Sequence, residues 1–125
     1  MTDLSDTIIK HFSAMFPLDN KQAQIAMSTV LLNYAVVYTS RKISKESQKI
    51  VMSLCLLFIQ GMTESEARFR NMVTLGTLLS ADAAHLQEAK MQDAKEKVDA
   101  VKMLDTSEKV QNCARALLQA LSWWW

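Results

Sequence analysis

Apolar residues recur along this chain at the three- and four-residue spacing of α-helices. The clearest stripe lies near the C-terminus, at positions 110, 113, 114, 117, 118 and 121. Similar stripes, separated by short polar stretches, predict five to seven helices in all. We expect these helices at 4–15, 21–39, 45–62, 64–79 and 107–121, with two short helices within 80–104.

The segment 21–39 differs from the others because apolar residues cover most of its circumference. Such a helix is normally packed on several sides, so we expect it at the centre of the molecule. Gly76 lies inside the predicted helix 64–79, where glycine costs about 1 kcal/mol relative to alanine. This cost favours a neighbouring helix that approaches closely at that position.

Two helix starts carry capping signals. Asp19 or Asn20 can cap the segment 21–39 by accepting a hydrogen bond from an unpaired amide. Residues 63–66 have the spacing of a capping box, in which the Thr63 hydroxyl and the Glu66 carboxylate each serve one backbone amide. This box predicts where the fourth helix begins.

Two similar patterns, 30–34 and 73–77, lie 43 residues apart. A period of this length suits armadillo or HEAT-type helical repeats. We therefore predict an all-α fold, a right-handed armadillo/HEAT-like helical repeat stack of two to three repeats, in preference to a closed four-helix bundle. The expected organisation is a single helical domain over 1–125, with an N-terminal helix in 1–18, the repeats in 19–121 and a Trp-rich tail in 122–125.

The composition agrees with a helical core. Half of the 125 residues are hydrophobic, and only 2 Gly and 1 Pro are present, which leaves few helix breakers. The net charge of +1 gives the chain as a whole no attraction to nucleic acid or to an anionic membrane. The longest apolar runs, such as 51–59, are too short to span a bilayer.

No residue pattern indicates a catalytic or metal site. His11 and His85 have no Cys or acidic partner at ligand spacing, so we expect neither a metal nor a cofactor. Cys55 and Cys113 lie in apolar helical stretches, which predicts buried thiols, no disulfide and a reducing compartment, cytoplasmic or nuclear. The sequence thus predicts a binding module rather than an enzyme.

Three runs of the chain, 29–36, 66–79 and 109–118, carry a family resemblance. The first contains Leu-Asn-Tyr, the second contains Arg-Phe-Arg-Asn followed by an apolar stretch with one glycine, and the third resembles a closing helix. From residue 22 onward, the chain resembles the C-terminal half of a PUL domain. This is the armadillo-like module of the phospholipase A2-activating protein and ubiquitin-homeostasis adaptor family.

The resemblance implies a non-catalytic adaptor in ubiquitin-dependent protein handling. Its partner would be the acidic, tyrosine-containing C-terminal tail of the valosin-containing AAA+ ATPase, held in a basic groove on the concave face of the stack. By similarity, Arg70 would contact the tail, and Asn33 and Tyr34 would line the groove. An arginine pairs two-pronged with a carboxylate, and an asparagine can bond the backbone of an extended peptide.

Each of these residues also has a structural interpretation. Arg70 can be a surface arginine with a solvated head and a packed stem. Asn33 can cap an internal backbone group, and Tyr34 can lie in the core. Arg68, on a different face of the same helix, is expected to pair with Glu64 in solvent.

A basic link between two predicted helices contains Arg41, Lys42 and Lys45. It is either a solvated link or a positive rim that steers an acidic peptide. The three terminal tryptophans, 123–125, either cover the end of the repeat stack, form an exposed aromatic anchor, or belong to an altered terminus. The sequence leaves these alternatives open.

A second function also stays open. The chain can be a structural half-module whose exposed N-terminal repeat face completes a repeat stack with another chain or with itself. A shortened solenoid leaves apolar helix faces uncovered, which favours self-association.

Overall fold

The computed structural model describes residues 20–40, 45–81 and 83–122. Six α-helices make up this part of the chain, and no strand occurs within it. They are α2 (Lys21–Thr39), α3 (Lys45–Gly61), α4 (Ser65–Ala81), α5 (Ala83–Met91), α6 (Ala94–Leu104) and α7 (Glu108–Ser122). The predicted all-α class is confirmed, whereas the helix expected at 4–15 lies outside the described residues.

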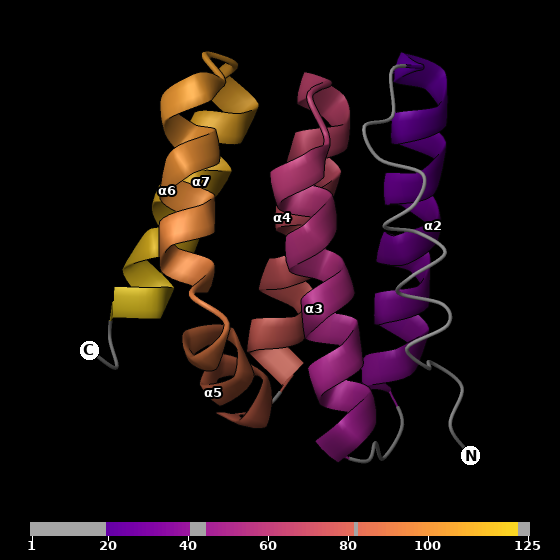
Figure 1. Cartoon of the computed structure of the whole chain (residues 1–125), viewed down its shortest axis with the longest axis vertical. Helices are drawn as coiled ribbons and strands as arrows, with labels where there is room; N and C mark the ends of the chain where they lie inside the picture. Colours follow the sequence, from indigo (N-terminus) through magenta and orange to yellow (C-terminus); the bar gives the residue numbers. More distant parts are fainter. Residues whose placement is uncertain (1–19, 41–44, 82, 123–125) are drawn as a thin grey trace.

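The helices stack side by side (Figure 1). Helix α2 lies at one edge, α3 and α4 form the middle, and α6 and α7 lie at the other edge, with α5 below them. Helix α4 contacts both α2 and α7, while α3 contacts α4, α5 and α6. This packing is compatible with a helical repeat stack, and its right-handed turn stays a prediction.

Helices α2, α4 and α7 form one layer with a constant register. Side chains bond between Gln24 and Thr63, 39 residues apart, and between Thr29 and Arg70, 41 residues apart. Glu66 meets Lys109, 43 residues away. The residue numbers rise together on both sides of these contacts, and Gly76 further along α4 lies beside Leu117 of α7. The three helices therefore run parallel, with offsets close to the 43-residue period of the sequence.

The prediction that the segment 21–39 is the central helix was wrong. Helix α2 lies at the edge of the described stack, and α4 lies at its centre (Figure 1). Three apolar residues of α2, Val30, Val36 and Val37, are 65%, 56% and 53% exposed. The apolar circumference of α2 therefore reflects an apolar outer side that no described residue covers.

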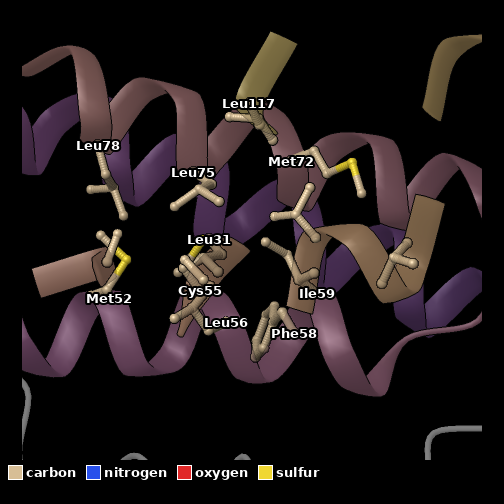
Figure 2. Packing of buried hydrophobic residues seen from close by; sticks show 14 of the residues in the cluster. Leu31, Met52, Cys55, Leu56, Phe58, Ile59, Met72, Leu75, Leu78 and Leu117 are labelled. Atoms are coloured by element: carbon tan, nitrogen blue, oxygen red, sulfur yellow. The ribbon is translucent and has the colours of Figure 1, made fainter. Parts of the chain in front are cut away.

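The core lies between α3 and α4 (Figure 2). Apolar side chains of α3 face those of α4, and α2 and α7 each add a leucine. The labelled residues are Leu31 of α2, Met52, Cys55, Leu56, Phe58 and Ile59 of α3, Met72, Leu75 and Leu78 of α4, and Leu117 of α7. Each large apolar side chain contributes about 1.5–3 kcal/mol on burial, so this core holds α2, α4 and α7 in place.

One of the two capping predictions is confirmed and the other was wrong. Asn20 caps α2, because its Oδ1 accepts a hydrogen bond from the Ala23 amide at 3.0 Å. Helix α4 begins one residue later than expected, and the Ala67 amide donates to Glu64 Oε1 at 2.9 Å. Glu64 caps this helix in place of a capping box, which leaves the Glu66 carboxylate available for other contacts.

Gly76 does not mark a tight helix contact, contrary to the expectation from sequence. A Cβ atom at this position would lie 3.7 Å from Leu117 Cδ2, an ordinary van der Waals distance. We therefore expect Gly76→Ala to raise the free energy of unfolding by about 0.5–1 kcal/mol, because alanine is the better helix former. Urea denaturation measures this change, and a lower stability of the variant would show that α7 needs the glycine.

Candidate peptide-binding site

Three helices bring charged side chains together at one end of the α2–α4–α7 layer. The Arg70 Nε of α4 donates to Glu66 Oε2 at 3.0 Å, and Arg70 Nη1 donates to the Thr29 hydroxyl of α2. Lys109 Nζ of α7 donates to the other oxygen of the same carboxylate, Glu66 Oε1, at 3.0 Å. We call Thr29, Glu66, Arg70 and Lys109 the charge cluster.

The charge cluster is accessible to solvent. The side chains of Arg70, Glu66 and Lys109 are 34%, 32% and 59% exposed. The Lys109 ammonium lies 4.6 Å from the centroid of the Phe69 ring, a distance that suits a cation–π contact. Arg70 Nη2 has no hydrogen-bond partner among the described residues, so it can receive an acceptor from outside.

Glu66 carries a negative charge at neutral pH. Hydrogen bonds from Lys109 and then Arg70 lower the pKa of Glu66, against a smaller opposing effect of burial. The charge cluster therefore contains two cations and one anion and keeps a net positive charge. Such a site attracts carboxylates.

An open groove with a volume of about 700 Å³ follows the charge cluster along the same three helices. Its lining is mostly small or apolar, which creates the hollow. The residues include Thr39 of α2, Val73, Gly76 and Thr77 of α4, and Cys113, Ala116, Leu117 and Ala120 of α7. On α4 the lining begins at Met72, two residues beyond Arg70, and Thr77 in the middle of the groove lies about 10 Å along the helix from Arg70.

The cysteines offer no reactive thiolate. Cys55 is buried and Cys113 is half-buried in the wall of the groove, and both are free. Burial raises the pKa of each thiol. A thiol with a raised pKa stays protonated at neutral pH and is a poor nucleophile.

Of the residues expected at the peptide site, Arg70 lies in the charge cluster. Asn33 is exposed on α2, one helical turn beyond Thr29, so it does not cap a buried backbone group. Tyr34 is half-buried and packs against the hydrophobic core. Arg70 and Asn33 are thus both accessible, and Tyr34 supports the helix that carries Asn33.

The candidate basic rim stays a prediction. Arg41 and Lys42 lie outside the described residues, as does the side chain of Lys45. The three terminal tryptophans, 123–125, lie outside them too.

The expected solvent pair of Arg68 and Glu64 was wrong. Arg68 Nη1 instead contacts Asp105 Oδ2 at 3.0 Å, and the two side chains are only 13% and 2% exposed. Arg68 Nε also donates to the Met62 carbonyl at 3.1 Å. Arg68 turns inward because Asp105, buried in the link between α6 and α7, provides a partner. The two arginines of α4 therefore serve different purposes.

Sequence reasoning missed the contributions of Thr29, Glu66 and Lys109. A usable signal existed, because Glu66 and Lys109 are separated by the same 43 residues as the two similar patterns. Residues one repeat apart on parallel helices lie next to each other in a stack. The repeat period therefore predicts the contact once the stack is assumed.

No group of three or more His, Cys, Asp or Glu residues that could hold a metal occurs among the described residues. His85 is buried in α5, and His11 lies outside the described part. A helix long and apolar enough to cross a bilayer is also missing from the described segments.

Comparisons with known proteins identify relatives of this chain. The family model described as PUL domain matches residues 1–116. The match thus begins before residue 22, where the resemblance was expected to start. The phospholipase A-2-activating protein of Xenopus laevis is 31% identical over 117 residues, which cover 93% of this chain and 14% of that curated relative. No solved structure matches.

Proposed function

The chain belongs to the PUL domain family of protein-interaction modules, and we propose that it binds the acidic, tyrosine-containing C-terminal tail of the valosin-containing AAA+ ATPase. The family is linked to ubiquitin-related adaptors and is not a known catalytic family. In this proposal the chain recruits the ATPase to ubiquitin-dependent protein handling in the cytoplasm or nucleus. The tail lies across α2, α4 and α7.

The charge cluster is the main support for this proposal. Arg70 is held between Thr29 and Glu66, and its Nη2 group remains available. Lys109 adds a second accessible cation from the neighbouring helix. A carboxylate that reaches both cations forms charge-assisted hydrogen bonds, which are the stronger class of hydrogen bond.

The groove supports the same proposal. It is open, mostly apolar and about 700 Å³ in volume, which lies within the volume range of ligand pockets in proteins. An extended peptide advances about 3.3 Å per residue, so about three residues lead from the charge cluster to the middle of the groove. An acidic segment followed by an aromatic or aliphatic side chain fits this arrangement.

We expect Arg70→Ala to weaken binding of a synthetic acidic tail peptide by about tenfold or more, which corresponds to the roughly 1.4 kcal/mol typical of a lost charge-assisted contact. Fluorescence polarisation with a labelled peptide measures the dissociation constant. The matched control is Arg115→Ala, which removes the same side chain from an exposed position of α7 outside the charge cluster. Equal binding by both variants would remove Arg70 from the site.

The outer side of α2 favours a second candidate function. Val30, Val36 and Val37 are exposed on the edge helix of the described stack, so this side can dock another helical repeat or a second copy of the chain. In that case the chain is a structural half-module. Light scattering over a range of concentrations tests this alternative, and a monomer at all concentrations counts against self-association.

A further inference from the structure

The Glu66 carboxylate already bonds Arg70 and Lys109, the two cations that would bind the proposed peptide. Glu66 places one oxygen 3.0 Å from Arg70 Nε and the other 3.0 Å from Lys109 Nζ. A carboxylate of a bound peptide would bridge the same two groups in the same way. The charge cluster thus already contains an internal counterpart of its ligand.

We propose that Glu66 is an internal competitor, which segments with several neighbouring carboxylates displace with a net gain in free energy. The proposal rests on the proposed function of the same site, because it requires Arg70 and Lys109 to receive the peptide. A peptide with one carboxylate exchanges with Glu66 one for one and gains little. A peptide with two or more displaces Glu66 and still forms additional contacts.

A ligand carboxylate can replace Glu66 in its ion pairs. All three charged side chains of the cluster are at least 32% exposed, and water and salt weaken ion pairs at such positions. A ligand can therefore replace Glu66 without first opening a buried pair. The buried pair between Arg68 and Asp105 on the same helix does not share this property.

Glu66 is also dispensable for the start of α4. Its position in the first turn suggested a capping role, but the Ala67 amide is bonded to Glu64. Among the described residues, the Glu66 carboxylate pairs with Arg70 and Lys109 alone. Release of Glu66 by a ligand, or its substitution by glutamine, therefore leaves the helix cap intact.

Charge accounts for this net gain. The cations of the cluster lower the pKa of Glu66, so Glu66 stays ionised under the conditions in which an acidic peptide is ionised. The two cations and one anion leave a single excess positive charge. Exchange of Glu66 for one ligand carboxylate leaves this excess charge unchanged, and a second ligand carboxylate neutralises it.

The test compares two peptides of equal length, one with three adjacent acidic residues and one with a single acidic residue, the others being replaced by the corresponding amides. We expect Glu66→Gln to bind the singly acidic peptide roughly threefold to tenfold more tightly, the change expected for removal of an exposed ion-pair competitor. Binding of the triply acidic peptide should tighten by a similar factor, because both peptides displace the same carboxylate, and the triply acidic peptide should remain the tighter ligand. Isothermal titration calorimetry provides both constants.

Two controls separate the possible results. Glu96→Gln removes the same charge from an exposed position of α6 and should leave both constants unchanged. Weaker or unchanged binding by Glu66→Gln, or equal binding of the two peptides by the unmodified chain, would overturn the competitor role. If Arg70→Ala binds as the unmodified chain does, the proposed peptide site itself fails. If Arg70→Ala binds weakly but Glu66→Gln does not bind more tightly, only the role of Glu66 fails.

Discussion

Replacing Asp105 by alanine is expected to lower the free energy of unfolding by about 3–5 kcal/mol, the cost of removing one partner from a buried ion pair. The Asp105 side chain is 2% exposed and contacts Arg68 at 3.0 Å. It also accepts hydrogen bonds from the Ser65 hydroxyl and the Ser107 amide, each at 2.9 Å. Its removal leaves a largely buried guanidinium without its charge partner and two further donors unpaired.

Chemical denaturation in urea measures this loss. Asp99→Ala is the matched control, because Asp99 is exposed on α6, and surface changes of this kind stay within about 0.5 kcal/mol. Asp105→Asn keeps the shape and the acceptor toward Ser107 but removes the charge, so it should fall between the two. Similar stabilities for the Asp105 and Asp99 variants would mean that Arg68 finds another partner.

The same residue predicts acid sensitivity. Burial alone raises the pKa of Asp105, but hydrogen bonds from Ser107, Arg68 and Ser65 together lower the pKa below the ordinary value of 3.8. A carboxyl group whose pKa is lower in the folded state contributes stability above its unfolded-state pKa. This contribution is lost as the pH falls from about 4 through the lowered folded-state pKa, and Asp105→Asn should lack this part of the pH dependence.

The helices were predictable because their apolar spacing is regular over many residues. Helix α2 was predicted at its observed bounds, and α3, α4 and α7 were predicted with ends one or two residues away. The weak similarity between 30–34 and 73–77 also reflected the real register, because contacts between α2, α4 and α7 join residues 39–43 positions apart. Helix periodicity and the repeat period can both be detected in a single sequence.

The polar contacts were less predictable, because a charged side chain can pair either with a neighbour on its own helix or with a residue distant in the sequence. The rule that charges four residues apart on a helix attract each other correctly describes Glu66 and Arg70. The same rule assigned Arg68 to Glu64, but Arg68 bonds Asp105, 37 residues further along the chain. Only the packing of the link between α6 and α7 decides which of the two arginines turns inward.

The candidate peptide site was predictable only in part, because its residues come from three different helices. Arg70 was identified by the resemblance of 66–79 to the PUL family. Its partners on α2 and α7 required the register of three helices, and the groove required the small side chains of α4 and α7 to lie next to each other. None of these follows from the periodicity of one helix.

Gln24→Ala is the second substitution with a large expected effect, a loss of about 2 kcal/mol in the free energy of unfolding. Gln24 is 1% exposed, and its Oε1 accepts hydrogen bonds from the amides of Thr63 at 2.9 Å and Glu64 at 2.8 Å. Its Nε2 donates to the Thr63 hydroxyl at 3.1 Å. Alanine removes these bonds from the start of α4, and unpaired donors at a partly buried position cost about 1–3 kcal/mol.

Gln22, on the same helix, provides the control for Gln24. Gln22→Ala makes the same change at an exposed position of α2, so its unfolding free energy should stay within about 0.5 kcal/mol of the unmodified chain. Because Gln24 holds α2 against the start of α4, it also sets the register that brings Thr29 to Arg70. Gln24→Ala should therefore weaken binding of the acidic peptide as well, while Gln22→Ala should not. Equal stability and equal binding for both variants would show that the core between α3 and α4 alone fixes this register.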